Sequence, residues 1–294
     1  MIKGMSRTIV AVNAHPDDEA LLMSGTLAKA AAAGHRVVLV VATDGDLGMT
    51  SAEFRSANGP ALADRRLTEL QASAEALGAA RVDYLGYGDS GMDGPIPPDI
   101  NGRTRLLRAD VHEAAERLAT ILRAEQADVL IGYDANGGYG HRDHVRVHEM
   151  ARLAAAAAGT PWLLEATIPR DLLARTVEIV AKVYRFPPSF DVTSFRRAFS
   201  SAEQITHRVR VGRCVAAKRA SMAAHRSQAA ADGGADRTLA MFLRLPDPIF
   251  GWVFGREWYV DATGFAPGEV VPPRRDRCSQ GRAGNLVPDV FADR

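Results

Sequence analysis

Cysteine is scarce in this sequence, which has only Cys214 and Cys278 among its 294 residues. Neither has a second Cys or a His at the short spacing of a thiolate zinc site, and two cysteines cannot build a multi-bridge disulfide framework. Such sparing use of cysteine is typical of proteins in a reducing compartment. We therefore expect a cytoplasmic protein without structural disulfides.

Long apolar runs and a strong charge imbalance are also missing. No stretch approaches the ~18 apolar residues of a membrane span, and no apolar signal-peptide core precedes His15. The net charge of +1 and the pI near 7.9 give no broad basic field, which argues against nucleic acid as the main partner. These absences favour a small-molecule partner and no membrane insertion, and they leave the oligomeric state open, a homo-oligomer included.

Apolar residues are abundant, at 47% of the chain, and suffice for a sizeable core. Strand-like runs cover residues 8–12, 37–42, 82–85, 129–133, 162–168 and 256–261. Helix-like segments cover residues 19–33, 61–77, 108–125, a stretch after His144, 172–181 and 213–231. This alternation predicts an α/β fold with a Rossmann-like, mostly parallel sheet and flanking helices. No Gly-x-Gly-x-x-Gly follows the first strand, so no nucleotide cofactor is indicated.

The first polar motif, residues 13–19, follows the first predicted strand and places three acidic side chains and one His in a short turn. In open α/β sheets, ligands bind at the carboxyl ends of the strands. Like charges this close repel each other unless a cation or a proton offsets them. The motif either caps the following helix, as Asp and Asn often do, or binds a divalent metal.

A second polar motif, residues 136–144, follows the predicted strand 129–133 and contains two further His. The two strand ends can bring both motifs to one site, which favours metal binding over capping. His15, Asp18 and His144 would then supply two imidazoles and one carboxylate, a set that suits catalytic zinc or ferrous iron. His148, one turn later, is either a fourth ligand or a neighbouring or surface residue.

The segments Ala-His-Pro-Asp-Asp-Glu (residues 14–19) and His-x-Asp-His (residues 141–144) resemble the LmbE/PIG-L family of metal-dependent N-acetylglucosaminyl deacetylases. The chain is most similar to the branch containing the mycothiol-biosynthesis deacetylase and the mycothiol S-conjugate amidase. The resemblance extends from residue 8 to about residue 260. Further agreement comes from residues 86–92, the Arg66/Glu69 pair, and Lys218 through His225-Arg226-Ser227-Gln228.

The resemblance implies a role for several residues at the site. Asp17, next to the expected ligand carboxylate, is the expected general base. His141 is implied to stabilise the oxyanion, and Tyr139 to bind that oxyanion or to help protonate the amine. Arg66 and Asp89 are implied to bind the substrate, although a solvated helix face is an alternative for Arg66.

We expect one deacetylase domain over residues 1–264, with a core over about 8–160 and a substrate-pocket extension over about 161–264. Beyond Gly264 the chain is rich in Pro, Gly and Arg, which predicts a polar, flexible tail over residues 265–294.

Five residues carry open questions about the substrate. Gly88 stands where related enzymes commonly have Arg, so a contact or a loop brace is lost. Arg142 stands where Pro is common, and it either favours an anionic substrate or points to solvent. Asp44 and Asp46 either bind substrate or are turn residues, and His225 is either structural or close to the pocket.

The resemblance implies hydrolysis of an N-acyl group, most simply acetyl, from an amino sugar such as a GlcNAc glycoside. Zinc, or ferrous iron, would polarise the amide and acidify the attacking water. An amidase that cleaves a mycothiol-like conjugate would use the same site. A metal-dependent sugar-binding protein without catalysis is the alternative of another class, and the presence of Asp17 argues against it.

Overall fold

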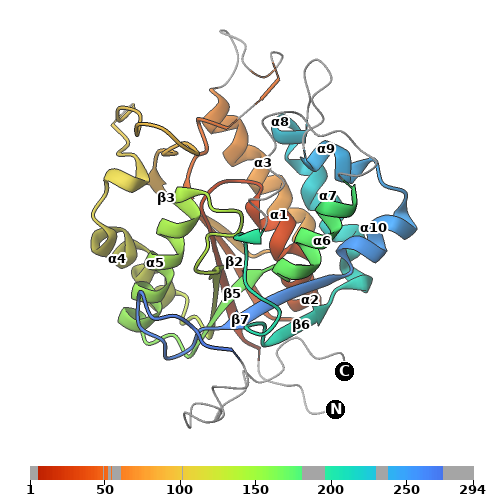
Figure 1. The fold of residues 1–294 in the computed structure, drawn as a ribbon. Coiled ribbons are helices and arrows are strands. Elements are labelled where there is room, and N and C mark those ends of the chain that lie inside the picture. Colours follow the sequence, from red (N-terminus) through yellow and green to blue (C-terminus); the bar gives the residue numbers. More distant parts are fainter. Residues whose placement is uncertain are drawn as a thin grey trace.

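The computed structural model describes residues 6–48, 50–51, 54, 61–100, 102–180, 196–229 and 238–273. Within them lies a seven-stranded sheet of order β3-β2-β1-β4-β5-β7-β6 (Figure 1). Its strands are β1 Thr8–Asn13, β2 Arg36–Thr43, β3 Arg81–Tyr87, β4 Val129–Tyr133, β5 Trp162–Thr167, β6 His207–Arg210 and β7 Arg256–Asp261. The five strands from β3 to β5 are parallel, whereas β7 is antiparallel to both β5 and β6. The predicted mostly parallel α/β sheet is confirmed.

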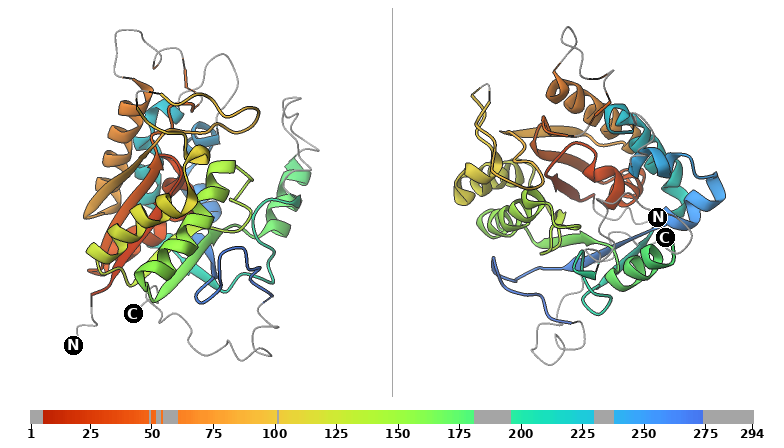
Figure 2. Two further views of the ribbon diagram at one scale, coloured as in Figure 1. Left: turned by 90° about the vertical axis from the view of Figure 1, so that its left-hand side faces the viewer. Right: turned by 45° about the horizontal axis from the view of Figure 1, so that its top comes forward.

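Helices cover both faces of this sheet (Figures 1 and 2). They are α1 Asp18–Leu22, α2 Ser24–Ala32, α3 Leu62–Leu77, α4 Val111–Ala124, α5 Arg142–Ala158, α6 Arg170–Val180, α7 Val215–Ala224, α8 Arg226–Ala229, α9 Thr238–Leu243 and α10 Asp247–Phe254, with short 3₁₀ turns η2 Leu106–Arg108 and η4 Gly212–Cys214. Helices α4 and α5 lie on one face, and α2, α3 and α7 lie on the other. None of the described helices is both long and apolar enough to cross a membrane.

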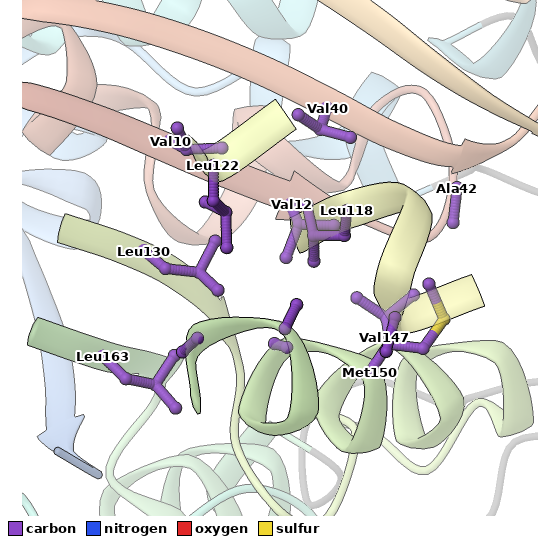
Figure 3. Packing of buried hydrophobic residues seen from close by; sticks show 14 of the residues in the cluster. Val10, Val12, Val40, Ala42, Leu118, Leu122, Leu130, Val147, Met150 and Leu163 are labelled. Carbon is purple, nitrogen blue, oxygen red and sulfur yellow. The ribbon is translucent and has the colours of Figure 1, made fainter. Parts of the chain in front are cut away.

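The side chains of β1 alternate between two buried clusters. Val10 and Val12 pack with residues of α4 and α5 (Figure 3), while Ile9 and Ala11 pack with residues of α2 and α3. Because both faces of the parallel sheet are covered, its strands are nearly continuous apolar runs rather than alternating ones. Those runs are what made the strands recognisable in the sequence.

The helix predicted after the first motif is broken into α1 and α2. The chain turns at Met23 (φ −139°, ψ −4°), and the first amides of α2, those of Gly25 and Thr26, donate to the carboxylate of Glu257 at 2.9 and 2.7 Å. A carboxylate at the amino-terminal end of a helix accepts from amides that have no partner within the helix, and its charge is favourable in the helix dipole. Glu257 lies more than 230 residues away in the chain, so no local pattern predicts the break.

The carboxyl-terminal part of the chain departs further from the sequence-based expectation. Strand β6 and helices α9 and α10 were not predicted, and the helix expected over 213–231 is divided at His225 into α7 and α8. Phe265 and Val271 are buried against the α4/α5 side of the core. The packed part of the chain thus includes the beginning of the expected tail, whereas residues 274–294 lie outside the described residues.

Strands β1 and β4 are neighbours, and the order of the chain reverses between them. From β1 the chain continues outward through β2 and β3, whereas from β4 it continues the other way through β5. In open α/β sheets the crevice at such a reversal is where ligands bind. The two polar motifs follow these two strands.

Candidate metal centre and active site

Three polar side chains from the two motifs converge above β1 and β4. Oδ2 of Asp18 lies 3.3 Å from Nδ1 of His15 and 3.3 Å from Nε2 of His144, and those two nitrogens are 3.3 Å apart. All three residues are buried. Tetrahedral zinc with bonds of about 2.0–2.1 Å separates its ligand atoms by about 3.3–3.4 Å. The donors therefore fit such an ion, and three protein ligands is the usual number at a catalytic zinc site.

The other nitrogen of His15 faces two more carboxylates. Nε2 lies 3.3 Å from Oδ2 of Asp143 and 3.5 Å from Oδ1 of Asp89, and donor atoms of these three residues lie within 4.8 Å of one another. The nitrogens of His15, His141 and His144 form a comparable group. In the Asp18 triangle all three donor distances are 3.3 Å, which suits one tetrahedral ion. Asp143, on the other nitrogen of His15, is placed to orient that ring, as carboxylates commonly do for metal-binding His.

Tyr133, the last residue of β4, supports the triangle. Its hydroxyl donates to Oδ2 of Asp18 at 2.6 Å and accepts from the amide of Ala14 at 2.8 Å. Its ring stacks on that of His144, with centroids 4.3 Å apart and planes 14° apart. From the sequence, Tyr133 is expected only as a residue of the strand. Its position at the end of the strand that carries the second motif was the available signal.

Charges around the triangle favour a cation. Burial alone would raise the pKa of Asp18, but His144 and His15 hold it well below its usual value. Burial would likewise lower the pKa of His15, yet carboxylates led by Asp89 raise it well above the usual value. The carboxylates that retain a proton on His15 are the groups that would stabilise a divalent cation in its place.

Asp17 precedes α1 in an unusual backbone conformation, with φ 112° and ψ −23°, which non-glycine residues rarely adopt. Its side chain is 22% exposed and accepts from Nη2 of Arg66 at 3.0 Å. Burial raises the pKa of Asp17 to about 6, with Arg66 opposing and Asp18 reinforcing the shift. A carboxylate with a pKa near neutrality can both accept and release a proton at physiological pH.

Arg66 is buried and holds the turn around Asp17. Besides that carboxylate, its guanidinium donates to the carbonyls of Pro16 at 2.5 Å and Gly45 at 2.8 Å. The solvated helix face considered for Arg66 is therefore wrong, because only 3% of the residue is exposed. Nε of Arg66 is buried and has no hydrogen-bond partner among the described residues.

Asp89, the other residue expected to bind substrate, is also buried and close to the triangle. Its Oδ1 accepts from the amide of Gly91 at 2.7 Å and lies 3.5 Å from the His15 ring. The structure thus brings Asp89 to the same site as the expected ligands.

His141 is the N-cap residue of α5. Its Nδ1 accepts from the amide of Asp143 at 3.2 Å, so the neutral ring carries its proton on Nε2. Burial lowers the pKa of His141 to about 4, and the neighbouring His15 and His144 add to this shift. Near neutral pH the ring is therefore an uncharged hydrogen-bond donor.

Tyr139 lies in a glycine-rich loop beside these rings. Its side chain is 48% exposed, and its ring centroid is 5.1 Å from that of His144. Gly138 and Gly140, on either side, have φ of +63° and +96°, a region that glycine enters without the strain other residues incur. The loop therefore depends on glycine for its path around Tyr139.

A segment from the carboxyl-terminal half braces this loop, which the sequence did not predict. The amide of Phe199 donates to the carbonyl of Gly138 at 2.7 Å, and Asn136 donates to the carbonyl of Phe199 at 2.7 Å. Asp134, fully buried, accepts from Gly138 at 3.0 Å and from the Ser200 hydroxyl at 2.9 Å. Phe199 itself has φ +55°, so its backbone is adapted to this contact.

Comparison with known proteins identifies the family of this chain. The sequence profile of the PIG-L family, described as GlcNAc-PI de-N-acetylase, matches residues 10–155. A 1D-myo-inositol 2-acetamido-2-deoxy-alpha-D-glucopyranoside deacetylase of Thermomonospora curvata is 33% identical over 303 residues, covering 95% of this chain and 96% of that protein. The chain belongs to the PIG-L family.

A second relative supports membership of the PIG-L family, and a solved structure shares the fold. The 1D-myo-inositol 2-acetamido-2-deoxy-alpha-D-glucopyranoside deacetylase 2 of Catenulispora acidiphila is 34% identical, with 97% of each chain covered. The N,N'-diacetylchitobiose deacetylase of Pyrococcus horikoshii, solved with its inhibitor MPG, shares the fold with a TM-score of 0.58 at 21% identity, covering 91% of this chain and 87% of that one. The expected family, the α/β fold and the classification as an amide-hydrolysing enzyme are confirmed.

In this PIG-L chain, Arg142 is engaged by the backbone of a neighbouring loop. Its guanidinium donates to the carbonyls of Gly91 at 2.5 Å, Gly94 at 2.8 Å and Ser90. Both interpretations offered from the sequence, an anionic substrate or a solvated side chain, are replaced by a third. Arg142 fixes the loop that follows β3.

The space beside Gly88 is filled by Arg105. A Cβ at Gly88 would lie 3.1 Å from Nη1 of Arg105. The same Nη1 donates to both carboxylate oxygens of Asp46, at 2.7 and 2.8 Å, and to the carbonyl of Asp89 at 2.7 Å. A brace is therefore present, supplied from another segment. Asp46 serves as its partner.

Asp44 and His148 also have partners away from the triangle. Asp44 pairs with Arg103 at 3.0 Å. Nδ1 of His148 lies 3.1 Å from the carbonyl of Tyr133 and 3.1 Å from Oε1 of Glu165. We therefore assign His148 to a buried polar cluster behind the site and not to a fourth ligand position.

Proposed function

We propose that this PIG-L enzyme is a zinc-dependent hydrolase that removes the N-acetyl group from an amino sugar carried as a GlcNAc glycoside. The observation that carries the proposal is the triangle of His15, Asp18 and His144 with the carboxylate of Asp17 next to it in the same turn. The names of the relatives from T. curvata and C. acidiphila, both deacetylases of an acetamido-glucopyranoside, support this substrate class.

In the proposed reaction, His15, Asp18 and His144 would hold a zinc ion, which would polarise the amide carbonyl and lower the pKa of the attacking water. Asp17 accepts the proton of that water through its carboxylate and later delivers it to the departing sugar nitrogen. Nε2–H of His141 donates to the oxygen that becomes negative during attack, a preorganised form of stabilisation. Tyr139, in its glycine-rich loop, supplies a second donor at that oxygen or at the nitrogen. The balance is one amide and one water converted to acetate and amine.

Substrate orientation falls to Arg66 and Asp89 in this proposal. Both sit beside the triangle, and Nε of Arg66 is free of hydrogen bonds to described residues. A carboxylate such as Asp89 accepts hydrogen bonds from sugar hydroxyls, and a guanidinium donates to hydroxyl or carbonyl oxygens. The choice of zinc over ferrous iron rests on the donor spacing and is part of the proposal.

The test is an assay for acetate and free amine with metal-free, zinc-loaded and ferrous-loaded protein. The substrates are N-acetylglucosaminyl inositol, free N-acetylglucosamine, and a glucosaminyl–cysteinyl amide that represents the amidase alternative. We expect acetate and amine in equal amounts from the GlcNAc glycoside, with zinc restoring the activity. His15→Ala and His144→Ala are expected to lose both the metal and the activity.

Each alternative has its own outcome in this assay. Preferential cleavage of the cysteinyl amide would replace the deacetylase proposal with the amidase. Metal-dependent binding of the sugars without release of acetate would indicate a sugar-binding protein. Full metal occupancy in both His variants would refute the assigned ligands.

A further inference from the structure

A buried pair, Glu19 and His225, joins the first motif to the carboxyl-terminal part of the chain. Nε2 of His225 lies 2.5 Å from Oε1 of Glu19, and neither residue is exposed to solvent. The two residues are 206 positions apart in the chain. The sequence leaves open whether His225 is structural or close to the pocket, and membership of the PIG-L family assigns this pair no role.

The second oxygen of Glu19 holds the backbone of Asp17. Oε2 accepts from the amide of Asp17 at 3.1 Å, while Oε1 also accepts from the Ser73 hydroxyl at 2.7 Å. His225 and Ser73 thus fix one oxygen of Glu19, and the other oxygen is left aimed at Asp17. One carboxylate connects α3, the corner between α7 and α8, and the turn that carries Asp17.

Asp17 needs such a hold because of its backbone. With φ 112° it occupies a region that residues with a Cβ avoid, and such a conformation persists only where surrounding contacts over-determine it. Arg66 holds the same turn by donating hydrogen bonds to the side-chain carboxylate of Asp17 and to the carbonyl of Pro16. Glu19 is the contact that holds its amide.

We propose that Glu19 and His225 are positioning residues that keep Asp17 in its strained conformation, so that its carboxylate stays in place to exchange the proton during hydrolysis. This proposal rests on the proposed function, in which Asp17 is the base. His225 acts through Glu19 and touches neither the substrate nor the ion. The carboxyl-terminal half of the chain thereby controls the turnover rate of a site built on β1 and β4.

Glu69, one helical turn before Ser73 on α3, provides a matched control. Glu69 is also buried, and its carboxylate accepts from the amide of Ser227 at 2.8 Å and from the hydroxyl of Ser227 at 2.6 Å. It therefore anchors the same corner between α7 and α8 to α3, but its carboxylate is committed to Ser227 and not to Asp17. Glu69→Gln disturbs the corner without releasing the catalytic turn.

The experiment compares purified, metal-loaded His225→Leu, His225→Gln and Glu69→Gln with the parent enzyme. For His225→Leu we expect kcat to fall by about 10–100-fold, the range for a small misplacement of a reacting group, with KM and metal content unchanged. His225→Gln retains a donor and should recover most of the lost kcat. Glu69→Gln should keep the parental kcat even where its unfolding midpoint drops. An equal loss of kcat in Glu69→Gln would overturn the proposal, as would a loss of metal from His225→Leu.

Two further measurements separate this proposal from the proposed function. In an Asp17→Asn background, His225→Leu should cause no further loss of kcat, whereas independent effects would multiply. A crystal structure of His225→Leu should show Asp17 moved out of its left-handed conformation. If the parent enzyme releases no acetate, only the proposed function is refuted. The crystal structure still tests the positioning role, because it reports the backbone of Asp17 and not the activity. An unchanged Asp17 backbone would overturn the positioning role.

Discussion

The adjacent carboxylates Asp17 and Asp18 offer the sharpest test of the site, because the structure gives them different surroundings. Oδ2 of Asp18 faces His15 and His144 at 3.3 Å each. Oδ1 of Asp17 instead faces Arg66 at 3.0 Å. Substituting Asn at each position changes one oxygen for an amide group and leaves the size of the side chain almost unchanged.

For Asp17→Asn we expect the metal to remain and kcat to fall on the order of 10²-fold or more, the scale for loss of a general base. That factor corresponds to about 2.7 kcal/mol of transition-state stabilisation. The carbonyl oxygen of the new amide side chain can still accept from Arg66, so the turn should survive. The fall in kcat would then report lost proton transfer and not a displaced loop.

For Asp18→Asn we expect weaker metal binding, because a neutral amide replaces the one anionic ligand of the triangle. Its affinity for zinc should fall by more than the roughly 10–100-fold that loss of a supporting partner costs. Metal content after dialysis, and kcat with and without added zinc, measure both effects. Loss of metal from Asp17→Asn together with retention in Asp18→Asn would refute the assignment and exchange the two roles.

Three further tests, the last with a matched control, concern residues that support the site and the packing of α2. Tyr133→Phe leaves the buried amide of Ala14 without its acceptor and should lower the free energy of unfolding by about 1–3 kcal/mol. The zinc affinity should fall by about 10–100-fold, and parental affinity in a chelator competition would contradict this. Arg142→Met should raise KM by about tenfold through a displaced loop with metal content retained, and an unchanged KM in steady-state kinetics would speak against that brace. Gly25→Ala would place a Cβ 2.7 Å from Val211 and should cost about 1–3 kcal/mol in urea denaturation, whereas Gly212→Ala, with open space around it, should cost less.

The sequence predicted the parts of the fold and the site that depend on local pattern. Apolar runs marked the parallel strands because those strands are buried on both faces. The two motifs followed β1 and β4, and the reversal of strand order at that point brings His15, Asp18 and His144 together. The family resemblance separated Asp17, as the expected base, from its neighbour Asp18, as the expected ligand.

The parts that the sequence did not predict depend on partners far along the chain. The break after α1 requires Glu257, and the support of Asp18 requires Tyr133, a residue that looks only like part of an apolar strand. Arg142 could not be placed because the direction of a long side chain follows from the loop it meets. The role of Phe199 depends on a backbone conformation that no composition or spacing reveals.

The three proposed ligands of the triangle come from two segments that lie up to 129 residues apart in the chain. An unfolded chain holds these groups far apart, so an ion that binds them all binds only the folded sheet. Its binding free energy therefore adds to the free energy of unfolding, by an amount that grows with the logarithm of free metal concentration. The melting temperature of this protein should consequently rise with added zinc. A melting curve therefore measures the occupancy of the metal site without any substrate.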